Sequence, residues 1–165
     1  MKFAKILLPT DYSTYSDYAA EVAQSLARSV GSTVELVHVY AVPVTLLPDG
    51  TPVPPAPSAL LAAQERAEAD MTEAKRRFET AAPNVPVEGR AVPGDTLEEL
   101  MALAGSGRFD LIVMGTHGRS GVRRLLMGSL AEAVIRHSPI PVIAVRLPPP
   151  AQATEHAPDV EPAHT

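Results

Sequence analysis

The sequence of 165 residues contains no cysteine. A disulfide framework, a thiolate zinc site and a cysteine nucleophile are therefore all excluded. The sequence also lacks any apolar run near the roughly 20 residues that a membrane-spanning helix requires. The apolar stretch close to the amino terminus ends at Pro9 and acidic residues follow it, so we interpret it as a strand and not as a signal peptide. We accordingly expect a cytoplasmic protein without a membrane partner.

Positive charge is also scarce. The chain has 14 Lys and Arg residues against 19 Asp and Glu residues, which gives a formal net charge of −5. Because a protein that binds nucleic acid generally needs a basic surface for the phosphates, we predict no nucleic-acid partner. The histidines show no spacing typical of metal ligands, and we predict no metal site.

The end of the chain has few large apolar side chains. Residues 148–165 are rich in proline, alanine and acidic residues and contain almost nothing to bury, which predicts a disordered tail. The preceding residues, 1–147, are enough for one domain with a core of its own.

Within residues 1–147, short apolar runs alternate with segments of helical periodicity. The predicted strands cover residues 3–8, 33–40, 85–92, 110–114 and 141–145, and the predicted helices cover residues 13–30, 58–82, 97–104 and 129–136. Six prolines between residues 41 and 57 predict a loop without an element of its own. The alternation predicts an α/β fold with a five-stranded parallel sheet covered by helices on both faces. Flavodoxin-like and Rossmann-like strand orders both satisfy this pattern.

In either order, a topological switch point lies beside the first strand, and ligands bind where the carboxyl ends of the strands meet at that point. The candidate residues after the first strand are Pro9, Thr10 and Asp11, and those at the end of the fourth are Met114 and Gly115. We expect these two groups to face each other.

The segment after the fourth strand carries the clearest chemical signal. Gly115 and Gly118 follow a central strand, where the backbone either approaches another group closely or adopts a positive φ. Gly128 and Ser129 precede the next helix, whose free N–H groups form a ready anion site. Glycines after a strand also make tight turns that bind nothing. The combination with a helix start at the switch point favours phosphate binding.

This loop differs from two better-known phosphate loops. A P-loop requires Gly-Lys-Ser/Thr, and the three lysines of the chain are Lys2, Lys5 and Lys75, all outside this loop. A dinucleotide fingerprint requires glycines after the first strand, and residues 9–13 contain none.

Several polar residues have two interpretations. Asp11 can cap the following helix or contact a ligand, and Ser129 can be a helix N-cap or a phosphate donor. His38 lies in a predicted central strand and is interpreted as a core or rim residue. His117 lies in the loop and is interpreted as solvated, because no orienting partner for a general base is evident.

The spacing Gly115-x2-Gly118-x9-Gly128-Ser129 resembles the ATP-binding signature of the universal stress protein family. The likeness extends over residues 2–145 and includes the opening residues 5–11, the strand at residues 37–39 and the closing residues 139–145. It implies strand order 3-2-1-4-5, an adenine nucleotide alpha hydrolase-like or Rossmann-like fold, and a homodimer.

The same resemblance implies a nucleotide site. Asp11 and the main chain near Val39 would meet adenine or ribose, and Met114 and Gly115 would line the ribose. Phosphates would be held by Gly118, Gly128, Ser129 and Leu130. Pro9 and Thr10 complete the expected site. The implied cofactor is ATP, with Mg²⁺ as a possible companion and AMP or ADP as alternatives.

Three functions fit these residues. The first is a stress-response or regulatory protein whose nucleotide-bound state carries the signal, with no catalytic residue assigned. The second is a slow ATP hydrolase or a phosphoryl or adenylyl transferase that uses the same site. The third is a protein that binds no nucleotide and acts through its dimer surface. For the dimer we expect pairing through residues 141–145, since the last strand lies at a sheet edge and carries no charge from Val142 to Val145.

Overall fold

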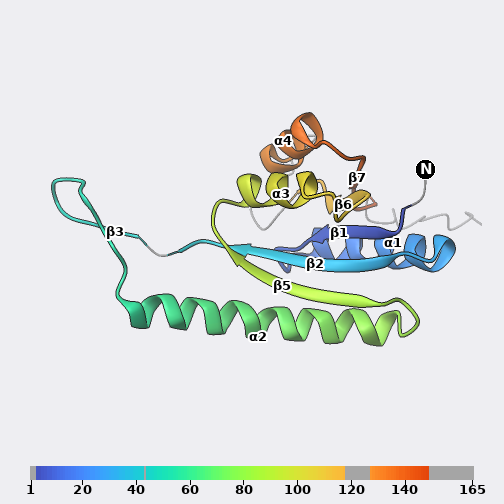
Figure 1. Ribbon diagram of the computed structural model, residues 1–165, viewed down its shortest axis with the longest axis horizontal. Coiled ribbons are helices and arrows are strands. Elements are labelled where there is room, and N and C mark those ends of the chain that lie inside the picture. The colour runs from blue at the N-terminus through green and yellow to red at the C-terminus, as the bar shows by residue number, and fades with distance from the viewer. Residues whose placement is uncertain (1–2, 43, 118–126, 149–165) are drawn as a thin grey trace, which may run out of the picture.

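The computed structural model describes residues 3–42, 44–117 and 127–148 (Figure 1). Its elements are β1 (Lys5–Pro9), α1 (Thr14–Val30), β2 (Thr33–Tyr40), β3 (Thr45–Leu46), β4 (Pro52–Val53), α2 (Pro57–Ala81), β5 (Val87–Pro93), α3 (Thr96–Gly105), β6 (Leu111–Gly115), α4 (Ser129–His137) and β7 (Val142–Val145). The predicted disordered tail lies outside the described residues except for Pro148.

Five of the strands form one parallel sheet in the order β5-β2-β1-β6-β7. Counted among these five strands alone, the order is 3-2-1-4-5, so the fold and strand order expected from the sequence are confirmed. Strand β1 lies in the middle, where its Leu7 is in register with Glu35 of β2 and with Ile112 of β6.

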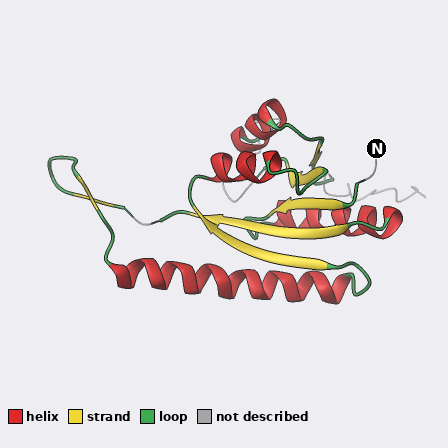
Figure 2. Cartoon of the chain, in the orientation of Figure 1, coloured by secondary structure: helices red, strands yellow, loops and turns green. Residues whose placement is uncertain are grey.

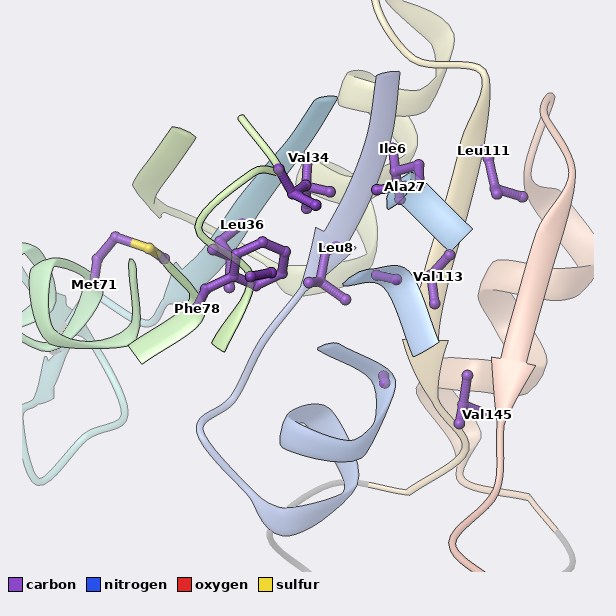
Figure 3. Packing of buried hydrophobic residues seen from close by; sticks show 14 residues of the cluster. Ile6, Leu8, Ala27, Val34, Leu36, Met71, Phe78, Leu111, Val113 and Val145 are labelled. Atoms are coloured by element: carbon purple, nitrogen blue, oxygen red, sulfur yellow. The ribbon is translucent and has the colours of Figure 1, made fainter. Parts of the chain in front are cut away.

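The sheet separates two hydrophobic clusters because successive side chains of a strand point to opposite faces. Ile6 and Leu8 of β1 belong to the cluster under α1 and α2, whereas Leu7 belongs to the cluster under α3 and α4. Figure 2 shows α2 on one side of the sheet and α3 and α4 on the other. Figure 3 shows the first cluster, in which Phe78 and Met71 of α2 extend toward the sheet. Each fully buried side chain of this size stabilises the fold by roughly 1.5–3 kcal/mol.

Both ends of α1 are capped. The hydroxyl of Ser13 accepts a hydrogen bond from the Ser16 N–H, which makes Ser13 the N-cap. Gly31 follows the helix with φ of 75°, and its N–H donates to the carbonyl of Ala27.

The prediction that residues 41–57 contain no element is wrong. β3 and β4 form a short antiparallel hairpin in which Thr45 is in register with Val53. The Asp49 carboxylate accepts from the Thr51 N–H at 2.9 Å, and Gly50 has φ of 84°. The Asp49-Gly50 pair therefore forms the turn of the hairpin, which the proline content alone did not predict.

Four of the five predicted strands begin one or two residues later in the structure, as β1 at Lys5, β5 at Val87, β6 at Leu111 and β7 at Val142. The strand expected from residue 85 is β5, which starts at Val87, because the Val85 N–H still donates to Ala82 at the exit of α2. The strand expected from residue 141 is β7, which starts at Val142, although the Pro141 carbonyl accepts from Ile112. No helix in the described part of the chain combines the length and the apolar character needed to cross a bilayer.

An acidic side chain is buried near the amino ends of the strands. Glu35 of β2 is 1% exposed, and its carboxylate lies 2.7 Å from Lys5 Nζ, 3.1 Å from Arg90 Nε and 3.9 Å from an Arg108 nitrogen. Lys5 also contacts Glu88 at 2.9 Å. Glu35, and after it Glu88, raises the pKa of Lys5 above its ordinary value, so the ammonium is charged throughout the neutral range.

We expect Lys5→Met to destabilise the protein by about 2–3 kcal/mol, because it removes the cation nearest to a buried carboxylate while Arg90 remains. The matched control is Lys75→Met, whose exposed pair with Glu79 at 3.5 Å should contribute at most about 0.5 kcal/mol. Urea unfolding at pH 7 gives both values. The Lys5 contribution should be complete below the ordinary lysine pKa of about 10.4 and lost as the pH rises through the raised pKa. Equal losses in the two variants would contradict the prediction.

Candidate functional site

A cavity of about 240 Å³ lies at the carboxyl ends of the central strands. All the predicted site residues that the structure describes line it, namely Pro9, Thr10, Asp11, Val39, Met114, Gly115, Gly128, Ser129 and Leu130. The remaining predicted residue, Gly118, lies outside the described residues. The structure thus brings together segments of the chain that are more than 100 residues apart. Whether these residues bind a nucleotide stays a prediction.

The cavity forms at this place because adjacent strands continue to opposite faces of the sheet. β1 leads into α1 on one face, and the chain after β6 leads into α4 on the other. The two connections diverge and leave a crevice between β1 and β6, as expected at a topological switch point.

The turn after β1 is held by hydrogen bonds from β2. The Thr10 N–H donates to the Val37 carbonyl at 2.9 Å, and the Thr10 carbonyl lies 2.8 Å from His38 Nδ1. A carbonyl oxygen can only accept, so Nδ1 carries the hydrogen. His38 therefore has a hydrogen-bond partner at the rim of the cavity, and its interpretation as a core or rim residue is confirmed.

Asp11 orients the N-cap of α1 and is not itself that N-cap. Its Oδ1 accepts from the Ser13 N–H at 3.1 Å and from the Ser13 hydroxyl at 2.6 Å. Ser13 in turn caps the helix. A contact between Asp11 and a ligand is compatible with this role, and it stays a prediction.

Tyr12 has a backbone conformation that is uncommon for a bulky residue. Its φ is 62°, and its ring centroid lies 4.5 Å from that of His38. Such a conformation persists when its surroundings impose it, and strained residues are frequent at binding sites. In this turn, the Tyr12 N–H donates to the Thr10 hydroxyl and the next N–H, that of Ser13, donates to Asp11 Oδ1, and these bonds supply that constraint.

The glycines of the candidate site serve close backbone packing. A Cβ atom on Gly115 would lie 2.9 Å from the carbonyl oxygen of Tyr15 in α1. A Cβ atom on Gly128 would lie 3.0 Å from the carbonyl oxygen of Thr116, to which the Gly128 N–H donates at 2.7 Å. Of the two reasons for glycine that the sequence left open, close approach therefore applies to Gly115, and positive φ does not.

Two of the helices whose first turns line the cavity, α3 and α4, are capped differently. Asp95 caps α3, accepting from the N–H groups of Leu97 at 3.0 Å and Glu98 at 3.1 Å. The N-cap of α4 is Gly128, which has no side chain to offer, and no side chain among the described residues forms a hydrogen bond at this cap. The interpretation of Ser129 as N-cap is therefore wrong, since it is the first residue of the helix. The first N–H groups of α4 have no partner within the helix and can bind an anion.

Other residues of the cavity were not predicted. Thr96 and Leu100 of α3 contribute to its wall, and the predicted end of a strand at residue 92 could have indicated them, since that strand ends at the same edge of the sheet. The prediction that His117 is solvated is wrong. Its side chain is half-buried at the cavity, with Nδ1 3.0 Å from the Thr116 hydroxyl and its ring 5.2 Å from that of Tyr15.

Among the described residues, no three His, Asp or Glu side chains are grouped as metal ligands.

A model of the universal stress protein family matches residues 2–146 of the chain. A universal stress protein of Thermus aquaticus is 37% identical over 145 residues, which cover 87% of this chain and 99% of the relative. Another, of Methanocaldococcus jannaschii, is 32% identical over 149 residues, which cover 88% of this chain and 84% of the relative.

Solved structures share the fold. Universal stress protein UspA from Lactobacillus plantarum superposes with a TM-score of 0.71 at 24% identity, covering 88% of this chain and 99% of its own. A universal stress protein in complex with cAMP has a TM-score of 0.65 at 23% identity, with 88% and 98% covered. One from Archaeoglobus fulgidus in complex with dAMP has a TM-score of 0.54 at 19% identity, with 87% and 98% covered.

We expect Gly115→Ala to destabilise the protein by about 1–3 kcal/mol, because the added methyl group meets the backbone of α1 and not a side chain that can move aside. Gly105→Ala is the matched control, since a Cβ atom there has no neighbour within 4 Å and alanine favours the helix by up to about 1 kcal/mol. Urea unfolding of both variants measures the difference. A Gly115→Ala variant as stable as the control would show that the backbone of α1 at Tyr15 does not pack closely against residue 115.

Proposed function

The chain belongs to the universal stress protein family, and from this premise we propose that it is a cytoplasmic stress-response or regulatory protein that binds an adenine nucleotide in the cavity at the switch point. ATP is the first candidate, and AMP and ADP are the alternatives. The nucleotide-bound state, and not its turnover, carries the signal.

The observation that carries this proposal is the start of α4 at the cavity. Ser129 and Leu130 line the cavity in the first turn of a helix whose N-cap, Gly128, has no side chain. Free N–H groups and the positive end of the helix dipole favour a phosphate at this position. In the proposed complex, the phosphates lie against these residues and against the loop that contains Gly118.

The opposite wall suits a nucleoside. Pro9, Val39 and Leu100 present apolar surface, while main-chain groups at the ends of β1 and β2 are available at the rim. Small-molecule sites generally combine such apolar walls with a few placed polar groups. We propose that Val39 and Asp11 contact adenine or ribose and that Met114 and Gly115 line the ribose. Mg²⁺, where present, would be held chiefly by the phosphates.

Two further observations support an adenine nucleotide without turnover. The related structures named above include complexes with cAMP and dAMP, which are both adenine nucleotides. Residues 115–128 contain no lysine. P-loop proteins and kinases use a positioned lysine on the phosphates, whereas the cations of this span are Arg119, Arg123 and Arg124, so no transfer residue of those classes is present in it and the proposal assigns binding.

For nucleotide binding, the informative variant is Ser129→Pro. Proline is tolerated at the first position of a helix, and Gly128 already has the extended conformation, with ψ of 150°, that a following proline requires. The variant removes one N–H donor, whereas Ser129→Ala removes the hydroxyl alone. A hydrogen bond to a charged group contributes about 1.5–3 kcal/mol, so Ser129→Pro should weaken ATP binding by roughly 10- to 100-fold.

Calorimetry with ATP measures these affinities, and thermal unfolding confirms that each variant is folded. We expect a dissociation constant on the order of micromolar for the wild-type protein. Wild-type protein that binds no adenine nucleotide would overturn the proposed function. Equal binding by wild type and Ser129→Pro would place the phosphates elsewhere.

We also propose a homodimer through the edge of the sheet formed by residues 141–145. β7 is an edge strand, and Ile143 on it is 38% exposed. The carbonyls of Pro141 and Val145 accept from Ile112 and Thr116, so residues 141, 143 and 145 direct their main-chain groups toward β6. Val142 and Ala144 consequently direct theirs outward, where a second copy could pair with them in an isologous contact.

Ala144→Pro should convert the dimer to a monomer, because it removes an outward N–H while proline remains compatible with an edge strand. Ala144→Val is the matched control, since it retains the N–H and should remain dimeric. Light scattering coupled to size exclusion at tens of micromolar gives the mass, and circular dichroism confirms the fold. A monomeric wild type, or a dimeric Ala144→Pro variant, would rule out this interface.

A further inference from the structure

Residues 44–64, called the arm below, comprise the β3–β4 hairpin, its connection to α2 and the first turns of α2. We propose that the arm is an interaction surface for the arm of a second copy of this chain. The hairpin of each copy packs against the first turns of α2 of the other.

The arm exposes several large apolar side chains. Val44 and Leu46 are each 62% exposed and Leu47 is 47% exposed in the hairpin region, while Leu60 and Leu61 are 40% and 56% exposed in α2. Scattered apolar residues on a surface need no explanation, but these five belong to one short segment. The arm therefore has the composition of a surface that is buried when a partner binds.

The arm extends beyond the body of the protein. The buried residues of α2 are Ala67, Met71, Ala74 and Phe78, so burial begins only in the third turn of the helix. A helix of 25 residues is about 38 Å long, and the seven residues of β5, on which it packs, extend about 23 Å. Figures 1 and 2 show the hairpin and the start of α2 projecting past the end of the sheet.

Within one chain, the two apolar parts of the arm do not cover each other. Pro54, Pro55 and Pro57 connect the hairpin to α2, and Ala56 between them has φ of −58° and ψ of 142°, the values of polyproline II. Such a connection is a semi-rigid spacer. It holds Leu46 away from Leu61, and both remain more than half exposed.

The charge of the arm favours a second copy over a charged partner or an anionic membrane surface. Between Val44 and Gln64, Asp49 at the tip of the hairpin has the only charged side chain. A strongly acidic or basic partner would find no counter-charge here, and an anionic membrane surface would find no lysine or arginine. A second arm brings an equally uncharged apolar surface, so the contact opposes no like charges along its length.

The contact is also reciprocal. Each arm offers a hairpin with Leu46 and Leu47 and a helix face with Leu60 and Leu61, so a two-fold arrangement forms the same contact twice. The exchange involves neither β7 nor the cavity. It is therefore independent of the proposed nucleotide site and of the proposed edge-strand dimer.

The absence of cysteine allows a direct test by disulfide cross-linking. Leu46→Cys and Leu61→Cys are purified as separate full-length proteins, mixed, oxidised mildly and analysed on non-reducing gels. Bound arms raise the local thiol concentration from micromolar toward millimolar, so the mixed disulfide should form about 10²-fold faster than with an unrelated site. The control mixes Leu46→Cys with Ser25→Cys, which places an exposed thiol on α1. Cross-linking no faster than this control would overturn the proposal.

A second measurement identifies the other possible occupants. The double variant Leu46→Cys/Leu61→Cys, oxidised at high dilution, should give little intramolecular disulfide, and rapid closure within one chain would mean that the arm folds on itself. Wild-type protein is also sedimented with neutral phosphatidylcholine vesicles. Sedimentation with the vesicles, together with no mixed disulfide above the control, would assign the arm to a lipid surface and overturn the proposal.

Discussion

The divergence of the chain at β1 and β6 is the constraint on which the rest of the structure depends. Two adjacent parallel strands continue to opposite faces of the sheet, so no helix in the described ranges crosses the gap between their carboxyl ends. The cavity is the direct consequence of this topology, and residues as distant in sequence as Thr10 and Ser129 meet there. The same divergence sets the start of α4 at the cavity, where its first N–H groups can meet a ligand.

Gly115 and Gly128 belong to the glycine spacing that resembles a nucleotide-binding signature, and both are also required for close backbone packing. Gly115 lets α1 lie against the end of β6, and Gly128 lets the chain return to Thr116 before α4 begins. Neither needs a ligand to explain it. Their packing nevertheless determines where Ser129 and Leu130 lie, so the proposed phosphate contacts depend on glycines that act through the backbone around them.

Periodicity predicted the parallel sheet and the approximate strand positions, and the geometry of parallel strands predicted that residues 9–11, Met114 and Gly115 lie at one edge of it. The strand order and the remaining cavity residues, such as Val39 and Leu130, came from the resemblance to the universal stress protein family. Contacts between side chains that are distant in sequence were not predictable from these local patterns. Glu35 lies in a run that reads as an apolar strand, and its burial depends on Lys5 and Arg90 from neighbouring strands. His117 was misassigned for the same reason, since Tyr15, which contacts its ring, is distant in sequence. The N-cap of α4 was missed by one residue because glycine and serine are both acceptable there.

The unequal capping of α3 and α4 has a consequence for recognition. At α3, the Asp95 carboxylate already accepts from the N–H groups of Leu97 and Glu98, whereas no described side chain caps the amino end of α4. The first N–H groups of α4 therefore have neither an intrahelical partner nor a described side-chain cap. In the proposed complex, a ligand with one anionic end and one apolar end would have a preferred orientation, because the reversed pose would bring its charge toward the Asp95 carboxylate. The unequal caps would then select the orientation of the ligand as well as its chemical class.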